Sequence, residues 1–172
     1  MFNASIRRCG FTKLRLDPCM YIICKGKDFT IITVGVDDLL LFSTTQELMD
    51  WTKADLHAEW EVKDMGEPSK IVSIEVNRTD DSITISQRKY IESILKGEDM
   101  DHSNSVAMPL DPNVTLTKNP DGSEGNRSNS FARLLGEVQF IANTTRPDIT
   151  HTISRLAPYI ANPSIQHITA LK

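Results

Sequence analysis

Cysteine is scarce in this chain, and its spacing fits neither a disulfide framework nor a zinc site. The three cysteines, Cys9, Cys19 and Cys24, form no CxxC pair and have no histidine cluster to accompany them. No sequence window approaches the roughly 18 consecutive apolar residues of a membrane span. The first residues also lack the apolar stretch of a secretory signal. We therefore expect an intracellular protein, cytoplasmic or nuclear, with reduced thiols and no membrane partner.

An excess of basic charge is missing as well. The formal net charge is −4, so the chain has no global positive field of the kind that dominates nonspecific binding to nucleic acids. Any contact with a polynucleotide has to depend on local patches. With 40% apolar residues among 172, the chain has enough material for a buried core. These values predict one globular domain, or one domain with a small appendage.

The most informative feature that is present is a pair of neighbouring aspartates, Asp37 and Asp38. They lie between two apolar runs, residues 31–36 and 39–42, which have the length and composition of short buried strands. The pair is therefore expected in the turn of a β-hairpin. Adjacent carboxylates repel each other and resist losing water, and a divalent cation relieves both effects. Acidic residues are also common in turns without any ion, so the dipeptide alone leaves both interpretations open.

Apolar runs around the acidic pair predict a meander of three antiparallel strands. Residues 20–24 and 29–36 flank the turn-forming residues 25–28, which is the pattern of a hairpin. Residues 39–42 add the third strand. The aspartates then lie at one end of this sheet.

A helix and a second hairpin are expected next. Thr44 and Glu47 have the spacing of a capping box, which predicts a helix start. Residues 72–77 alternate strictly between apolar and polar and predict one strand over 70–78, with a partner strand after the turn at 79–82. That turn contains another acidic pair, but its polar neighbours indicate an ordinary exposed loop.

The rest of the chain divides into a connector and a helical unit. Residues 97–129 are rich in proline, glycine and short polar side chains, which predicts a long connector. Helical apolar stripes fill residues 130–172, with a new helix opened by Arg146-Pro147-Asp148 and a helix shortened at Pro158. The last stripe is still in phase at the final residue, so we expect the chain to be a piece of something longer. The expected fold is α+β: an antiparallel sheet packed by helices over 1–96, then the connector, then the C-terminal helical unit.

Several segments, taken in order, resemble one protein family. They are Gly35-Val36-Asp37-Asp38-Leu39-Leu40, Trp60-Glu61-Val62-Lys63-Asp64-Met65-Gly66-Glu67, Ile74-Glu75-Val76, Ile85-Ser86-Gln87-Arg88-Lys89-Tyr90-Ile91 and Thr145-Arg146-Pro147-Asp148-Ile149. Their order and spacing resemble the reverse transcriptase of copia-type retrotransposons over nearly the whole chain. The resemblance implies a polymerase palm with a primer-grip-like hairpin in 1–96, and a thumb-like or connection-like unit in 130–172.

The resemblance also implies the chemistry of the acidic pair. By match of motif, Asp37 is the principal ligand of Mg²⁺, with Mn²⁺ as a substitute, and Asp38 is its weaker partner. The implied reaction is nucleotidyl transfer by a two-metal mechanism, with a template-primer and deoxynucleotides as ligands. Magnesium needs such oxygen ligands because it is a hard cation.

A second segment is implied to bind the primer. It comprises Gln87, Arg88, Lys89 and Tyr90. Basic side chains contact phosphates, and an aromatic ring stacks on a base or sugar. Without the resemblance, the same charges indicate a solvated helix start.

The chain departs from the family pattern in two ways. Gly35 stands where the family usually carries an aromatic residue, two places before the first aspartate. The catalytic aspartate of a preceding strand and the fingers region have no counterpart, so we expect Asp37 and Asp38 to hold Mg²⁺ weakly and the chain alone not to polymerise. Three roles stay open: part of an active enzyme, a noncatalytic nucleic-acid-binding or protein-interaction module whose exposed surface is covered by self-association or a partner, and an inert gene remnant.

Overall fold

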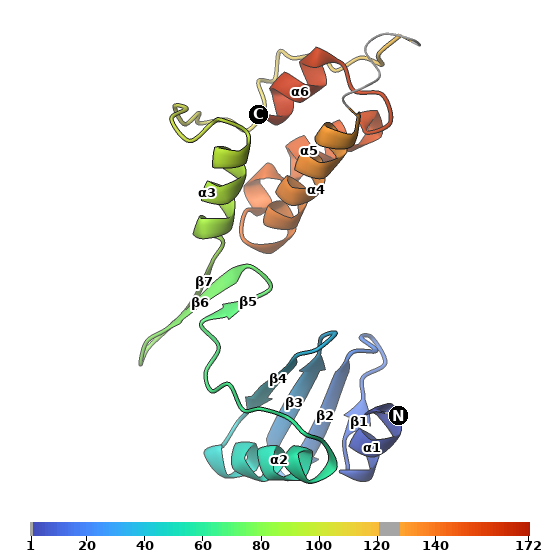
Figure 1. Cartoon of the computed structure of the whole chain (residues 1–172), viewed down its shortest axis with the longest axis vertical. Coiled ribbons are helices and arrows are strands. Elements are labelled where there is room, and N and C mark those ends of the chain that lie inside the picture. Colours follow the sequence, from blue (N-terminus) through green and yellow to red (C-terminus); the bar gives the residue numbers. More distant parts are fainter. Residues whose placement is uncertain (1, 121–127) are drawn as a thin grey trace. The chain divides into compact units, whose positions relative to one another are not determined.

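The computed structural model describes residues 2–120 and 128–172 (Figure 1). The chain divides into two compact units, Met1–Gly66 and Glu67–Lys172. Antiparallel sheets and a C-terminal group of helices make the fold α+β, which confirms the predicted class. The division falls at Gly66, whereas the sequence placed its first boundary at residue 96. The second hairpin therefore belongs to the same compact unit as the C-terminal helices.

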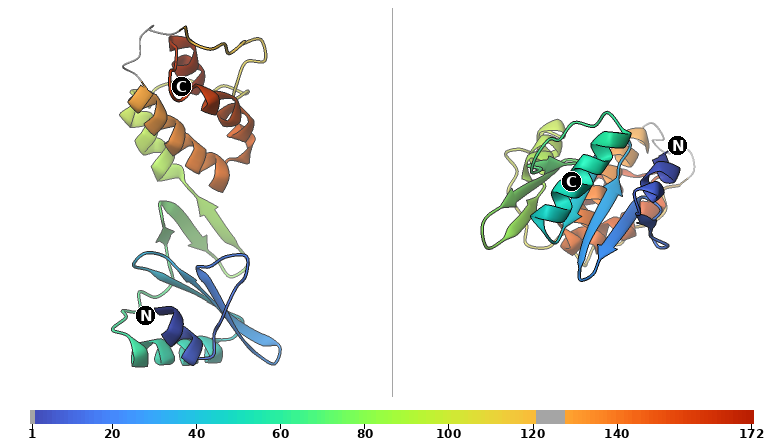
Figure 2. Two further views of the ribbon diagram at one scale, coloured as in Figure 1. Left: turned by 90° about the vertical axis from the view of Figure 1, so that its right-hand side faces the viewer. Right: turned by 90° about the horizontal axis from the view of Figure 1, so that it is seen from below.

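The N-terminal unit is one antiparallel sheet in the order β1-β2-β3-β4, with two helices among its described residues. Its elements are α1 (Phe2–Arg8), β1 (Thr12–Lys13), β2 (Met20–Lys25), β3 (Asp28–Val34), β4 (Leu39–Ser43) and α2 (Gln46–Glu59). The expected meander of three strands is present as β2, β3 and β4. Both helices cover the same face of the sheet (Figure 2).

The core of this unit lies between that face and the two helices. Tyr21 and Ile32 are directly opposite each other on neighbouring strands, so they point to the same face. Ile6 from α1 and Leu56 from α2 pack against them, and all four side chains are buried. The other face carries apolar residues that the described chain leaves open, and Phe42 is 53% exposed there.

Helix α1 ends at a glycine, the residue type that favours a helix C-terminus. Gly10 has a φ of +90°, in the left-handed region that favours glycine. The N–H of Phe11 donates to the carbonyl of Ile6 at 3.2 Å, and the N–H of Gly10 donates to the carbonyl of Arg7 at 3.0 Å. These are the two bonds of a Schellman motif, so the local sequence was sufficient to place this helix end.

The predicted capping box of Thr44 and Glu47 is wrong by one residue. The N-cap of α2 is Thr45, whose side chain accepts a hydrogen bond from the N–H of Leu48 at 3.3 Å. Thr44 bonds to the sheet instead, since its Oγ1 accepts from the N–H of Phe29 at 3.1 Å. Two adjacent threonines have nearly equal capping propensity, and only the pairing with β3 separates their roles.

The C-terminal unit begins with an antiparallel sheet in the order β5-β6-β7 and continues with helices. Its elements are β5 (Lys70–Ile71), β6 (Ile74–Arg78), β7 (Ile83–Ser86), α3 (Arg88–Gly97), α4 (Ser128–Thr144), η2 (Pro147–Ile149), α5 (Thr150–Leu156), η3 (Ala157–Tyr159) and α6 (Ile165–Leu171). Across the described ranges, no helix is both long and apolar enough to cross a bilayer.

The single strand expected over residues 70–78 is also wrong. Val72 and Ser73 have φ values of 44° and 65°, and Ile71 pairs with Ile74. Positive φ at both central residues is what a tight type I′ hairpin turn requires. Valine is β-branched and strained in this region, and the apolar alternation continues through it, so the sequence contained no turn signal here.

The helical unit packs around a core of its own. Leu135 of α4 and Leu156 of α5 are almost fully buried, and Leu116 from the connector is buried beside them. Residues 98–120 contain no helix or strand, yet they contribute to this core. The helix breaks predicted at Pro147 and Pro158 coincide with η2 and η3.

His167 lies in the first turn of α6. It is a cap, because its Nδ1 accepts from the N–H of Ser164 at 2.9 Å, but it is fully buried. Its ring stacks on Tyr159 with the centroids 3.9 Å apart. Burial lowers the pKa of this histidine, so the neutral ring acts as a structural side chain.

Candidate functional site

The acidic pair lies at one end of the N-terminal sheet, where the sequence predicted it. Strands β3 and β4 pair up to the ends that face each other, so residues 35–38 form the connecting loop. The N–H of Gly35 donates to the carbonyl of Asp38 at 2.7 Å and closes this loop. Asp37 and Asp38 are both exposed. The two carboxylates are therefore exposed to solvent, in a loop that is anchored by a core strand on either side.

These carboxylates fit a hard dication in ligand type but supply few ligands. Within the described residues, no group of three or more His, Cys, Asp or Glu side chains is arranged to hold a metal ion. Magnesium normally binds through one or two carboxylates, with phosphate oxygens and water completing its shell. The pair formed by Asp37 and Asp38 therefore depends on a phosphate ligand, or on a further carboxylate, for a complete site.

A second acidic pair provides a comparison within the same chain. Loop 79–82 joins β6 and β7, and the N–H of Thr79 donates to the carbonyl of Ser82 at 2.9 Å. Asp80 and Asp81 in this loop are exposed, like the first pair. Both pairs thus occupy hairpin loops closed by one backbone bond. Loop shape alone does not distinguish a metal site, and the difference lies in the flanking strands, because β7 is exposed along its whole length.

The four residues expected to bind a primer lie where β7 passes into α3, and the structure separates them into two kinds. Gln87 is 1% exposed, and its Oε1 accepts from the Thr145 hydroxyl at 2.7 Å. Its Nε2 is buried without a hydrogen-bond partner. Tyr90 is half-buried and meets Phe140 edge to face, with the ring centroids 5.6 Å apart. Gln87 and Tyr90 therefore face the end of α4 rather than solvent.

Arg88 and Lys89 are exposed, as a phosphate-binding role requires. Each is paired with a carboxylate: Arg88 Nε with Glu92 at 2.8 Å, and Lys89 Nζ with Glu75 at 2.8 Å. Hydrogen bonds from Lys89, from its side chain first and also from its backbone N–H, lower the pKa of Glu75. Exposed pairs of this kind contribute little to stability, so both cations remain available to a phosphate.

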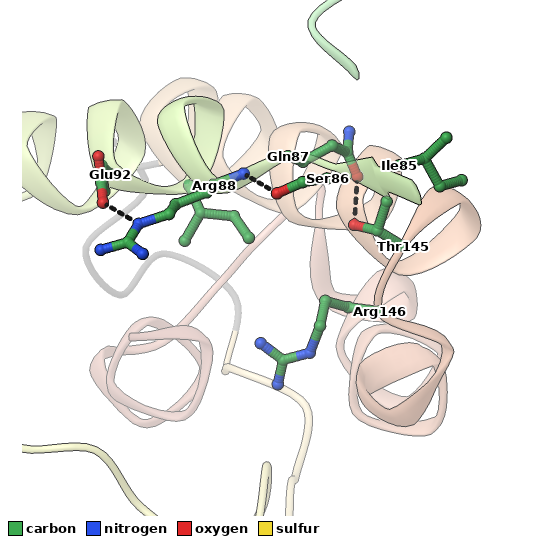
Figure 3. A pocket seen from close by; sticks show the side chains of 8 residues that line it. Ile85, Ser86, Gln87, Arg88, Glu92, Thr145 and Arg146 are labelled. Atoms are coloured by element: carbon green, nitrogen blue, oxygen red, sulfur yellow. Dashed lines mark hydrogen bonds and ion pairs between the residues drawn. The ribbon is translucent and has the colours of Figure 1, made fainter. Parts of the chain in front are cut away.

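A pocket of about 400 Å³ opens beside this segment (Figure 3). Its lining residues are Ile85, Ser86, Gln87, Arg88, Ile91, Glu92, Thr145 and Arg146. Arg146 is half exposed and pairs with Asp148 at 2.8 Å, which raises the pKa of the guanidinium. The sequence predicted Arg146 only as part of a helix start. No pattern in the sequence indicated that it lies beside the primer segment.

The family model for reverse transcriptase (RNA-dependent DNA polymerase) matches residues 2–112 of this chain. The match includes the acidic loop and the whole of α3. The chain belongs to the reverse transcriptase family.

Its relatives are of the copia type that the motifs indicated. The chain is similar to the retrovirus-related Pol polyproteins from transposon TNT 1-94 of Nicotiana tabacum (27% identical over 99% of this chain) and from transposon RE1 of Arabidopsis thaliana (29% over 95%). It is also similar to the putative transposon Ty5-1 protein of Saccharomyces cerevisiae (24% over 99%). The chain spans 14%, 11% and 55% of the lengths of these relatives. No solved structure matches it.

The two kinds of match cover different parts of this reverse transcriptase chain. The family model ends at residue 112 and leaves out Arg146 and helices α4 to α6. The Pol polyproteins align along nearly the whole chain. The C-terminal helices therefore belong to the region that the retrotransposon relatives share.

Proposed function

We propose that this chain is the part of a copia-type reverse transcriptase that carries the paired catalytic aspartates and guides the template-primer. Asp37 and Asp38 hold Mg²⁺ or Mn²⁺, and the segment from Gln87 to Tyr90, with the β6–β7 hairpin, lies along the primer strand. The observation that carries the proposal is the acidic loop itself, placed between two paired strands of a core sheet in a chain of this family. In this proposal the N-terminal sheet is a polymerase palm.

The residues present limit what the chain does alone. A bound dication supplies positive charge to the oxygens of a transferring phosphoryl group. Asp37 and Asp38 anchor such an ion through oxygen ligands but lack a third carboxylate among the described residues. We propose that they bind it weakly until a nucleotide, or an acidic residue from another polypeptide segment, completes the shell. The chain on its own then binds a template-primer and does not extend it.

Manganese broadening of backbone amide signals tests the metal assignment. In the ¹⁵N-labelled chain, with a deoxynucleotide present, Mn²⁺ should broaden the amides of residues 35–38 before those of 79–82. The double variant Asp37→Asn/Asp38→Asn should lose this effect. The matched variant Asp80→Asn/Asp81→Asn removes the same charge from the other hairpin loop and should retain it. Equal broadening of both loops would show that any exposed acidic turn attracts the ion, and would refute the assignment.

Primer extension tests the proposed incompleteness. With a homopolymer RNA template, a DNA primer and Mg²⁺ or Mn²⁺, the chain alone should give no extended product. Extension that disappears in Asp37→Asn would show that the chain contains a complete active site. That result would support the family reaction and overturn the proposed need for a further carboxylate.

Exposed apolar side chains favour a noncatalytic interaction module as a second candidate function. Phe42 on β4 is 53% exposed, and Ile83 and Ile85 on β7 are 63% and 55% exposed. Both strands are at the edge of their sheet, where unpaired backbone groups and apolar side chains invite association. Sedimentation equilibrium over a range of concentrations tests this candidate. A chain that stays monomeric throughout does not cover these strands by self-association.

A further inference from the structure

We infer that the pocket beside α3 binds a backbone phosphate of a polynucleotide, with Arg146 and Arg88 as its two cationic sides. The inference rests on the proposed function and deepens it. It extends the expected primer segment to Arg146, just beyond the C-terminal end of α4, and gives that residue a binding role.

The contact between Gln87 and Thr145 brings the two arginines to one pocket. The Thr145 hydroxyl donates to Gln87 Oε1 at 2.7 Å, although the two residues are 58 positions apart. This bond holds the end of α4 beside the start of α3, so that Arg146 and Arg88 line the same pocket. In Figure 3 the Arg146 guanidinium points away from the Gln87–Thr145 bond, and it pairs with Asp148. Gln87 thus positions the two arginines, and the arginines bind the ligand.

Both guanidinium groups have donors to spare. Arg88 uses only Nε for Glu92, and Arg146 uses Nε and Nη2 for Asp148. The Nη groups of Arg88 and the Nη1 group of Arg146 form no bond among the contacts of the described residues. A guanidinium presents five N–H donors in a planar fork that matches the oxygens of a phosphate. The side chains of Arg88 and Arg146 are 81% and 51% exposed, so a ligand can reach them.

The acidic neighbours determine how strongly this site attracts a polyanion. Glu92 lines the pocket and Asp148 pairs with Arg146, so the two positive charges are formally balanced. The pocket therefore produces little long-range attraction, and binding depends on hydrogen bonds made at contact. A phosphate has to displace the carboxylates, which are held only by exposed ion pairs. We expect weak binding that decreases as salt increases.

The remaining walls suit a nucleotide unit rather than a bare anion. Ser86 Oγ accepts from the N–H of Arg88 at 3.1 Å, which leaves its own hydroxyl hydrogen free to donate to a phosphate oxygen. Ile85 and Ile91 supply apolar surface for a sugar or base. The pocket, of about 400 Å³, is open to solvent, which suits one unit of a longer strand. A free nucleotide offers the same chemistry, so the experiment has to distinguish it from a polynucleotide.

Fluorescence anisotropy of a labelled RNA–DNA hybrid, measured over a range of salt concentrations, tests the inference. Arg146→Gln and Arg88→Gln should each weaken binding roughly tenfold at low salt and reduce the slope of log affinity against log salt by about one. Arg133→Gln is the matched control, because Arg133 is an exposed, ion-paired arginine of the same unit that neither lines the pocket nor belongs to the proposed primer segment or hairpin. It should bind within about twofold of the unmodified chain.

Asp148→Asn controls for folding, because it breaks the same ion pair as Arg146→Gln but keeps the arginine. It should bind the hybrid as tightly as the unmodified chain, or more tightly. Weakening by Asp148→Asn equal to that by Arg146→Gln would show that only the fold is affected, and would overturn the inference.

Other outcomes separate this inference from the proposed function. Hybrid binding that Arg146→Gln leaves unchanged overturns the pocket and leaves the proposed function standing. Equal loss in Arg133→Gln also overturns it, because the attraction is then diffuse. If dTTP binding depends on Arg146 while hybrid binding does not, the ligand is a free nucleotide and the polynucleotide assignment is wrong. Absence of any hybrid binding by the unmodified chain at low salt overturns both.

Discussion

The buried contact between Gln87 and Thr145 leads to a prediction with an unusual sign. Gln87 is 1% exposed, its Oε1 accepts from the Thr145 hydroxyl, and its Nε2 has no partner. Thr145→Val removes the donor and leaves Oε1 buried and unpaired, which should lower the free energy of unfolding by about 1–3 kcal/mol. Thr145 itself is only half-buried. When a substitution at Gln87 removes the acceptor of the Thr145 hydroxyl, a water molecule can therefore accept that hydrogen bond in its place.

Gln87→Met should behave differently, because it removes the paired oxygen and the unpaired nitrogen together. The lost hydrogen bond contributes about 0.5–1.5 kcal/mol, and an unsatisfied buried amide costs about 1–3 kcal/mol. The net change therefore lies between about 0.5 kcal/mol of destabilisation and about 2.5 kcal/mol of stabilisation. In the double variant Gln87→Met/Thr145→Val, the valine should change the free energy of unfolding little further. The coupling energy between the two positions is then about 1–3 kcal/mol.

Urea unfolding followed by far-UV circular dichroism measures these differences as shifts in midpoint at constant slope. Tryptophan fluorescence does not serve this purpose, because Trp51 and Trp60 both belong to the N-terminal unit. Gln87→Met that destabilises the chain as much as Thr145→Val would refute the reasoning, since Nε2 would then have a partner.

Two further predictions concern thiol reactivity and a strained turn. Burial and hydrogen bonding to Asp55 raise the pKa of Cys9 to about 11, so its thiolate fraction at pH 8 is about 0.001, against about 0.2 for an ordinary thiol. Mass spectrometry after brief iodoacetamide treatment should therefore find the exposed Cys19 and Cys24 labelled and Cys9 unlabelled; equal labelling would contradict this. Val72→Asn combined with Ser73→Gly supplies the residues that a type I′ turn prefers and should raise the free energy of unfolding by about 1 kcal/mol. A loss of stability in urea unfolding would mean that the turn has another conformation.

Local signals in the sequence were enough to predict most of the N-terminal fold. Gly10 ends a helix because its own backbone freedom permits the left-handed conformation, and residues 25–28 form a turn because of their own composition. The sequence placed the acidic pair at a hairpin end for the same reason, because the apolar runs beside it predict the two strands of the hairpin. The prediction failed at Val72, where a β-branched residue adopts a conformation that its own preferences oppose.

The second part of the candidate site could be predicted only in part, because its geometry depends on residues far apart in the chain. Tyr90 belongs to the expected primer segment, but nothing in that segment indicates contact with Phe140. Gln87 has the composition of an exposed polar residue, and its burial depends on a threonine at the end of α4. A periodic pattern shows which face of a helix is apolar, but not which element covers it.

Glu75 connects strand β6 to helix α3 in the C-terminal unit. This carboxylate belongs to β6, yet its partners are the side chain and backbone N–H of Lys89 in the first turn of α3. A polyanion that binds Lys89 has to break the ion pair between Lys89 and Glu75. The β6–β7 hairpin then loses one of its contacts with α3. Lys89 can thus either bind the polyanion or hold the hairpin against α3. A stronger ion pair between Lys89 and Glu75 makes the hairpin more rigid and weakens its binding to the polyanion.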